Sequence, residues 1–432
     1  MFGSLKTWLT GNAGAPETVA AGETTPPPRS EFLAGETIHD RNGRPRAHLF
    51  RLRGQPARDG TSAARLRDFD RILLDTLNAA PETWQQTPAY IPIQAASLDL
   101  PAVDALHGEK ITLLLHLTAD DRPDTARLRE LRKRGMRIGL FRQPDNADFA
   151  ALMQDCDCAA IDAADCEPVS IRDFSAAVRA TRGDPPSLLI CNLGSLDEYR
   201  LGHQWHYDLL HGHFAVNLPP RPETVGDPHR MILLELIRLA QGDADNASIA
   251  DAMKQDPMLG FRLLRYLNSP LLGLDHQIDS LNQALTVLGR QQLTRWLAVL
   301  LFSVREPDFA DWWLVESALT RGRMMELLGQ NNGSKHCDAL FLTGIFSRLD
   351  RLLRQPLAAA LKAMPLTVPI RAALLARSGP YAKLLTLAET AESFDTERID
   401  TAAREAGLDA AQVNRALLAA TAWTSDVTEH WT

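Results

Sequence analysis

The sequence predicts two kinds of structure in one chain, an α/β barrel followed by an all-α bundle. Between residues 31 and 218, short apolar runs of strand length alternate with amphipathic helical stretches, as a parallel α/β architecture requires. After the turn-rich segment Leu218–Pro222 the strand pattern ends, and helical periodicity continues to residue 432. A chain of 432 residues favours two or three domains. We therefore expect one domain at 31–218 and a second at 219–432.

The first 30 residues belong to neither domain. They pass from a short apolar pattern into a stretch rich in Ala, Gly, Thr and Pro that ends in Pro26-Pro27-Pro28. This composition cannot build a core, so residues 1–30 are predicted to be a flexible tail. The alternative is weak docking on a membrane or a partner through the apolar side chains of Phe2, Leu5, Trp8 and Leu9.

One repeat of the first domain shows the α/β pattern in order. Asp124 is expected to cap a helix, Gly135 to end it, and Met136–Leu140 to form a buried strand. Similar strands are expected at Ile111–Leu117, Cys158–Asp162, Leu188–Asn192 and Phe214–Asn217. This number of units favours a closed barrel, although periodicity alone leaves a doubly wound sheet open.

The second domain carries several helix-start signals. Two have the spacing of a capping box, and one is an aspartate followed by a first-turn proline. These pairs are Ser248 with Asp251, Ser280 with Gln283, and Asp256 with Pro257. The leucines that follow at helical spacing are expected to lie in the core.

Composition limits the classes of partner. The net charge of -8 gives no overall attraction to phosphate backbones, so nucleic acid is not the expected partner. The apolar run Trp296–Phe302 is far too short to cross a bilayer, and the N-terminus has no secretory hydrophobic region. We therefore expect a cytoplasmic protein without a transmembrane segment.

The five cysteines do not form a recognisable framework. Their number is odd and their spacing contains no CxxC pair, which argues against disulfides and against a structural zinc site. We interpret them as reduced thiols: Cys156, Cys158, Cys166, Cys191 and Cys337.

The most specific motifs lie in the helical part. They are QDPMLGFRLLRYLNSP (Gln255–Pro270), DSLNQALTVLG (Asp279–Gly289), LTGIFSRLD (Leu342–Asp350) and MPL (Met364–Leu366). In order and spacing they resemble the HDOD domain, and the resemblance covers most of Pro219–Phe394.

HDOD domains resemble HD phosphohydrolases, whose adjacent His and Asp bind a metal that activates water. Ser347-Arg348 stands at the corresponding place in this chain. Since a guanidinium repels a divalent metal, the resemblance implies that this chemistry is lost. The nearby His336-Cys337-Asp338 is interpreted as an ordinary loop before the next helix, not as a metal site.

The first domain resembles an EAL domain, a TIM-like barrel whose active members hydrolyse cyclic diguanylate with clustered carboxylates and metal ions. A degenerate EAL domain followed by HDOD is itself a known bacterial arrangement, and this domain order carries much of the inference. The segment TIHDRNGRPRAHLFR, Thr37–Arg51, resembles the first strand, hairpin and signature strand. Ala47 stands in place of the signature glutamate, and Arg51 is retained.

Other EAL motif positions depart from the family pattern in the same way. The replacements are Pro92 for an asparagine, His116 for a glutamate, Phe141 and Arg142 for two aspartates, Ala160 for a lysine, Cys191 and Gly194 for two glutamates, and His211 for a glutamine. Asp162 is retained. Two adjacent divalent ions need several hard oxygen ligands. The resemblance therefore implies neither catalytic residues nor a metal site in this chain, and no cofactor is expected.

Two further features remain as candidates. The histidine group His203, His206, His211 and His213 is dense enough for a transition metal, but we interpret it as a solvated helix followed by a strand at the barrel rim. Arg51 is the candidate ligand-binding residue, because its planar fork can grip a phosphate of cyclic di-GMP. Its alternative role is a salt bridge at the barrel mouth.

Three functions compete. The leading hypothesis is a non-catalytic signal-transduction regulator that binds a signalling protein partner. The second is a receptor that binds cyclic di-GMP without hydrolysis, and the third is a residual phosphodiesterase. The missing carboxylates argue strongly against the third hypothesis and only weakly against the second.

Overall fold

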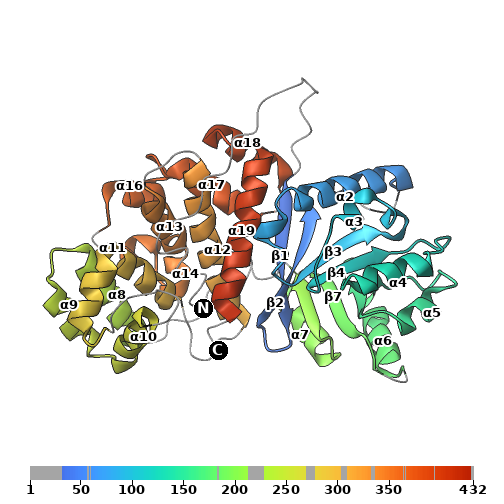
Figure 1. The fold of residues 1–432 in the computed structure, drawn as a ribbon, viewed down its shortest axis with the longest axis horizontal. Helices are drawn as coiled ribbons and strands as arrows, with labels where there is room; N and C mark the ends of the chain where they lie inside the picture. The colour runs from blue at the N-terminus through green and yellow to red at the C-terminus, as the bar shows by residue number, and fades with distance from the viewer. Residues whose placement is uncertain are drawn as a thin grey trace.

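The computed structural model describes residues 32–55, 58, 60–181, 184–212, 228–268, 278–302, 309–331, 336–362, 364, 366–393 and 395–429. The predicted tail and the segment Leu218–Pro222 lie outside the described residues. Figure 1 shows a barrel on one side, a group of helices on the other, and the helix α19 where the two meet.

The barrel is closed and contains eight strands, so the prediction of a barrel is confirmed over the doubly wound alternative. The strands are β1 (Leu33–Asp40), β2 (Pro45–Leu52), β3 (Ala89–Gln94), β4 (Ile111–His116), β5 (Arg137–Phe141), β6 (Cys158–Asp162), β7 (Ser187–Leu193) and β8 (Leu209–Gly212). Strand β1 is antiparallel to both of its neighbours, β2 and β8, and the other neighbouring strands are parallel. The parallel strands finish at one end of the barrel, which we call the barrel mouth.

The predicted strands agree with the observed ones to within one residue at each end, except for the last. The eighth strand ends at Gly212, and the segment expected there, Phe214–Asn217, lies outside the described residues. The helix signals of the repeat are confirmed: Asp124 accepts a hydrogen bond from the backbone N of Ala126 at 2.8 Å. Gly135 follows that helix at a φ of +87°.

Helices cover the outside of the barrel (Figure 1). They are α2 (Ala63–Asn78), α3 (Pro101–Asp104), α4 (Thr125–Lys133), α5 (Phe149–Gln154), α6 (Pro168–Arg179) and α7 (Leu196–Gln204), with short 3-10 turns η1 (Pro81–Thr83) and η2 (Ala95–Ser97). Because β1 and β2 form a hairpin, no helix lies between them in sequence. Helix α19 contacts both strands and covers this part of the barrel.

The second half of the chain is helical, as predicted. Its helices are α8 (Pro228–Gln241), α9 (Asn246–Met253), α10 (Pro257–Leu267), α11 (Leu281–Leu301), α12 (Phe309–Asn331), α13 (Cys337–Phe346), α14 (Leu349–Leu353), α15 (Leu357–Ala360), α16 (Val368–Arg371), η5 (Ala372–Ala376), α17 (Ala382–Thr390), α18 (Thr396–Ala406) and α19 (Ala410–Glu429). No described helix is long and apolar enough to cross a membrane.

Two of the three predicted helix starts in this half are confirmed, and one is wrong. Asp256 and Ser280 cap α10 and α11, as their spacing predicts. Helix α9 begins earlier than expected, because Asp245 is its cap and accepts a hydrogen bond from the backbone N of Ser248 at 2.8 Å. The Asp245 carboxylate satisfies a free backbone donor three residues further upstream than the Ser248 cap would, so the helix starts earlier and Ser248 lies inside it.

Buried contacts join the two halves. The backbone N of Leu33 donates to Asn414 Oδ1 at 2.8 Å, and His48 Nε2 lies 2.6 Å from Ser425 Oγ. Both partners lie on α19. A single apolar cluster runs from Phe32 in the barrel to Val427 at the end of the chain. The barrel and the helices therefore share one continuous core.

Candidate functional site

The interior of the barrel brings together several of the positions where the EAL resemblance expects catalytic groups. Ala47, Phe141, Ala160 and Cys191 are buried and belong to one apolar cluster. The cluster also includes Ile38, Leu49, Tyr90, Leu114, Cys158 and Leu189. Burial raises the pKa of the Cys191 thiol well above its usual value, so this sulfur stays neutral. The centre of the barrel is therefore filled by uncharged side chains.

Arg51 lies near the barrel mouth and binds a carboxylate that the sequence analysis did not identify. Arg51 Nε and Nη2 donate to the two carboxylate oxygens of Glu36 at 2.7 and 3.1 Å. On the other side, His211 Nε2 lies 2.5 Å from Glu36 Oε2. The salt bridge predicted as the alternative role of Arg51 is therefore present. Sequence reasoning missed Glu36 because only the antiparallel register of β1 brings it beside β2.

The barrel mouth contains a cavity of about 360 Å³. The side chains around it that carry polar or aromatic groups include Arg58, Gln94, His116, Phe141, Arg142 and Asp162. The His116 ring stacks on Phe141 with 3.7 Å between ring centroids, and the Arg58 guanidinium lies 5.7 Å from the same phenyl centroid. Burial, together with the charge of Arg58, holds the pKa of His116 well below its usual value. This imidazole is neutral at physiological pH.

Asp162, the acidic residue retained from the EAL pattern, is bound by another side chain at the mouth. Its Oδ2 accepts a hydrogen bond from Asn192 Nδ2 at 2.6 Å, and burial raises its pKa. Within the described residues, no group of three or more His, Cys, Asp or Glu side chains is arranged to hold a metal ion. Asp162 therefore has no described carboxylate or imidazole cluster around it with which to share a metal.

The described members of the histidine group have different surroundings. His203 and His206 are exposed, and His206 Nδ1 lies 3.3 Å from Arg41 Nη2. His211 is buried against Glu36, and His213 lies outside the described residues. The structure thus places His203 at the end of α7 and His211 on β8, where it serves the Arg51 salt bridge.

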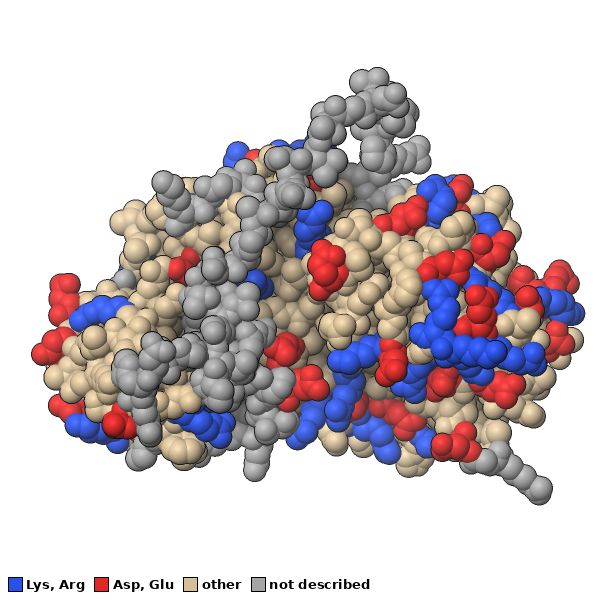
Figure 2. Space-filling model, in the orientation of Figure 1, with Lys and Arg blue, Asp and Glu red and all other residues tan. Residues whose placement is uncertain are grey.

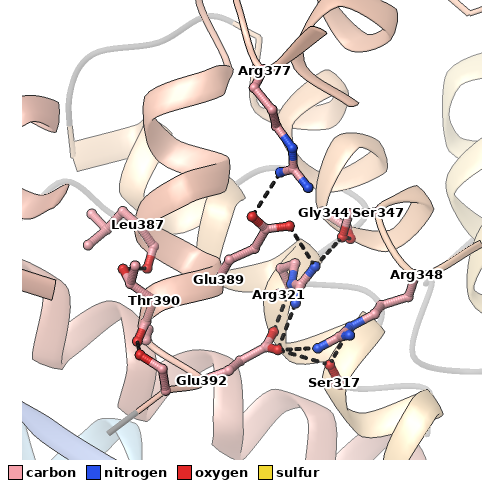
Figure 3. A network of polar contacts seen from close by, with 12 residues as sticks. Ser317, Arg321, Gly344, Ser347, Arg348, Arg377, Leu387, Glu389, Thr390 and Glu392 are labelled. Atoms are coloured by element: carbon pink, nitrogen blue, oxygen red, sulfur yellow. Dashed lines mark hydrogen bonds and ion pairs between the residues drawn. The ribbon is translucent and has the colours of Figure 1, made fainter. Parts of the chain in front are cut away.

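The helical part holds a second polar cluster, shown in Figure 3. At its centre, Arg321 Nε and Nη2 donate to the two oxygens of Glu392 at 2.7 and 2.6 Å. Arg348 donates to Ser317 Oγ at 3.0 Å and also to Glu392. Arg321 Nη1 donates to Ser347 Oγ at 2.7 Å. Ser347 and Arg348, the pair in place of His-Asp, are therefore parts of one hydrogen-bonded network.

The charges in this network compensate one another. Burial alone would raise the pKa of Glu392, but the guanidinium groups of Arg321 and Arg348 outweigh burial and hold that pKa below its usual value. Glu392 is therefore ionised at physiological pH, and two cations share its charge.

The interpretation of His336-Cys337-Asp338 as a loop is wrong for its last two residues. Helix α13 begins at Cys337, which places Asp338 in its first turn. There the Asp338 carboxylate pairs with Arg295. A carboxylate is stabilised at a helix N-terminus, where free backbone N–H groups give a partial positive charge, and this favours an earlier helix start.

Comparison with known proteins assigns the helical part. Residues 230–363 match the family model described as the HDOD domain. This part of the chain is an HDOD domain. The matched residues run from α8 to the end of α15 and include Ser347 and Arg348, so the HDOD resemblance inferred from the motifs is confirmed.

Two curated proteins match over part of their length. Cyclic di-GMP phosphodiesterase CdgJ of Vibrio cholerae is 26% identical over 254 residues, which is 58% of this chain and 58% of that protein. Uncharacterized protein YuxH of Bacillus subtilis is 26% identical over 201 residues, or 45% of this chain and 49% of that protein. The chain thus spans about half the length of these relatives.

Solved structures similar to this chain include EAL-domain proteins. One is an EAL domain protein from Listeria monocytogenes, with 12% identity over 42% of this chain and 86% of that one, at a TM-score of 0.32. Another is BlrP1 of Klebsiella pneumoniae in a calcium and cyclic di-GMP complex, with 15% identity over 45% and 56% of the chains, at a TM-score of 0.34. The chain thus combines an HDOD domain with a closed eight-stranded α/β barrel.

Proposed function

We propose that this chain is a non-catalytic bacterial signalling regulator that acts by binding a protein partner. The observation that carries the proposal is the apolar interior of the barrel, where Ala47, Phe141, Ala160 and Cys191 occupy positions that the EAL resemblance assigns to chemistry. Alkyl and phenyl groups cannot bind a divalent ion or activate water, and the buried Cys191 thiol stays neutral and supplies no hard oxygen ligand. The proposal includes a cytoplasmic location and a domain boundary near residue 218.

The HDOD domain supports the same proposal. Where an HD enzyme holds a metal, Arg321 and Arg348 place two positive charges against Glu392. A divalent cation would be repelled by both guanidinium groups. The relative named as a cyclic di-GMP phosphodiesterase supports a role in signalling related to that nucleotide, although this chain departs from the catalytic pattern.

The first experiment tests catalysis directly. The full chain is incubated with cyclic di-GMP and either Mg²⁺ or Mn²⁺, and the products are separated by chromatography. We expect no hydrolysis above that of a protein-free control. Turnover that is lost with a chelator and restored by metal would overturn the non-catalytic proposal.

The second experiment tests partner binding at exposed apolar side chains of the HDOD domain. Met258 and Phe261 on α10 are 51% and 56% exposed, and such groups contribute strongly to protein interfaces. We expect a Phe261→Glu variant to lose proteins that crosslink to the wild type in bacteria. A Val368→Glu variant is the control, because this side chain is 80% exposed on a different helix. Equal crosslinking by all three proteins would contradict this surface.

The second candidate function is a cyclic di-GMP receptor, and the mouth cavity favours it. Arg58 and Arg142 line that cavity, together with Gln94 and His116. In the described part of the chain, Gln94 Nε2 and His116 Nε2 are buried and have no hydrogen-bond partner. These groups suit a polar anionic ligand. Arg51 gives the receptor function less support, because its guanidinium group is already paired with Glu36.

Calorimetry with cyclic di-GMP separates the two candidates. The leading proposal predicts no binding heat. Saturable binding that Arg51→Ala abolishes would favour the receptor and assign Arg51 to the ligand. An Arg137→Ala variant is the control, since Arg137 is an exposed residue at the opposite end of a strand.

A further inference from the structure

A larger cavity lies where the barrel meets the HDOD domain. Its volume is about 730 Å³, within the range of small-molecule sites. Residues of β1, α12, α14, α17 and α19 line it. The lining also includes the segments that follow α13 and α17, and among its residues are Gly35, His39, Trp313, Thr320, Ser347 and Glu389. It shares no lining residue with the cavity at the barrel mouth. We call it the joint cavity.

One wall of the joint cavity carries an acidic group whose hydrogen-bonding capacity is unused. Glu316 on α12 lines the cavity and is only 6% exposed. Among the described residues, neither of its carboxylate oxygens accepts a hydrogen bond, although His39 Nε2 lies 3.3 Å from Oε2 as an ion-pair partner. A buried carboxylate without hydrogen bonds destabilises a fold, so its position needs an explanation. A ligand that donates to both oxygens supplies one.

The wall formed by the network of Figure 3 has the opposite character. There the three guanidinium groups of Arg321, Arg348 and Arg377 face the two carboxylates of Glu389 and Glu392. This set carries one excess positive charge. Asp350 and Arg351 also line the cavity, and their opposite charges add no net charge. An anionic group is favoured at this wall.

Helix α12 places the two walls close together. Glu316 and Ser317 are adjacent in sequence, and Arg321 follows one turn later. All three residues line the joint cavity. Because one helical turn rises about 5.4 Å, a molecule of modest size can reach both the Glu316 carboxylate and the arginines.

We propose that the joint cavity binds a small molecule with a planar edge of two parallel N–H donors at one end and an anionic group at the other. The donor edge pairs with Glu316, and the anionic group lies near Arg348 and Arg377. Two kinds of compound share this chemistry. A guanine nucleotide offers the ring N–H, the exocyclic amine and a phosphate, and an arginine-like molecule offers a guanidinium and a carboxylate.

The test is calorimetric titration of the full chain with guanosine monophosphate, adenosine monophosphate and L-arginine. Adenine presents a ring acceptor instead of the paired donors, so it is the matched negative probe. We expect saturable binding of guanosine monophosphate or L-arginine, and at least about tenfold weaker binding of adenosine monophosphate, as for the loss of a charged hydrogen bond. The probe that binds identifies which of the two compounds the cavity accepts.

Variants assign the binding to the joint cavity. Glu316→Gln is expected to weaken it at least about tenfold, because an amide offers one acceptor instead of two. Glu235→Gln is the matched control, since Glu235 is exposed on α8 and pairs with Arg238. The melting temperature of Glu316→Gln is measured alongside, because the variant also removes the ion pair with His39, and weaker binding must not be mistaken for unfolding.

Failure of this site is distinguishable from failure of the proposed function, since the probes bind away from the barrel mouth. The site is overturned if neither guanosine monophosphate nor L-arginine binds saturably. Binding that is equally strong in Glu316→Gln would also overturn it. In either case Glu316 is not part of the proposed binding site, and the absence of hydrolysis is decided separately by its own assay.

Discussion

The barrel interior and the polar network of Arg321, Ser347, Arg348, Glu389 and Glu392, which we call the HDOD network, are two places where family resemblance expects metal ligands. This chain fills them in different ways. In the barrel, Ala160 and its neighbours form an apolar cluster that needs no particular partner. In the HDOD network, the buried Arg321 and the partly buried Glu392 carry opposite charges that depend on each other. The apolar cluster adds to the hydrophobic core, whereas the HDOD network places opposite charges beside the joint cavity.

This difference has a physical consequence for tolerance to change. An apolar cluster loses stability roughly in proportion to the volume removed, but it strongly resists a charge. An ionic network tolerates replacement as a whole far better than the loss of one member, which leaves a buried charge without compensation. We therefore expect the barrel interior to be destabilised most by the introduction of a charge, and the HDOD network by the loss of one.

The largest effect is expected when a carboxylate is returned to the barrel. Ala160→Asp places an acid in the apolar cluster, where it must stay protonated at pH 7, and we expect a loss of about 5 kcal/mol in the free energy of unfolding. Urea denaturation measures this loss. The control Ala176→Asp lies on the exposed side of α6 and should cost about 1 kcal/mol or less. A small loss at residue 160 would mean that the interior is hydrated.

Breaking the HDOD network is expected to have the next largest effect. Arg321→Ala leaves Glu392 with only Arg348 and should reduce the free energy of unfolding by about 3–5 kcal/mol, measured in urea. A triple variant, Arg321→Met with Arg348→Met and Glu392→Leu, should recover most of this loss. If the triple variant is as unstable as the single one, the network is not mainly electrostatic.

His48, between the barrel and α19, is expected to make stability depend on pH. Burial lowers its pKa from 6.5 to about 4; the charge of Glu316 opposes this shift, and His39 lowers the pKa further. The folded state therefore binds fewer protons than the unfolded state between these values. The free energy of unfolding is therefore unaffected by His48 above pH 6.5. It falls as the pH is lowered toward 4, by up to about 3 kcal/mol, because protonation of His48 favours the unfolded state.

The measurement is urea denaturation at several pH values between 4 and 7. His48→Gln should flatten the pH dependence, while a variant of the exposed His107, His107→Gln, should keep it. An unchanged slope in His48→Gln would show that other groups cause the acid sensitivity.

The smallest effect is expected at the edge of the HDOD network. Arg377 pairs with Glu389, but its side chain is 51% exposed. Water and salt screen such a pair, so Arg377→Ala should reduce the free energy of unfolding by no more than about 1 kcal/mol. The loss should shrink further in high salt. A loss as large as that of Arg321→Ala would mean that the whole network acts as one unit.

Local signals in the sequence predicted much of the fold. The caps Asp124, Asp256 and Ser280 were correct because a side chain that bonds a backbone N–H two or three residues away depends only on nearby sequence. Ser248 failed because two suitable caps, Asp245 and Ser248, lie three residues apart. Spacing alone cannot choose between them, since packing of the whole helix decides where it begins.

The candidate sites were predictable only in part. The sequence indicated which catalytic side chains are replaced, and it named Arg51 as the barrel residue with a planar fork. It did not indicate Glu36, 15 residues away on the antiparallel strand, or Glu392, which is 71 residues from Arg321. The joint cavity is formed by residues as distant as Gly35 and Leu417, so it has no local pattern at all.

By itself the sequence determined the order of an α/β part and a helical part, the HDOD motifs, and the chemical nature of the replaced positions. Only the tertiary structure decided which charges pair and where cavities remain. Helix α19 packs against β1 and β2 although about 360 residues separate them in sequence. It thereby joins the two halves of the core, and its Leu417 lines the joint cavity. Periodicity and capping are local properties, whereas the pairing of buried charges depends on which distant elements pack together.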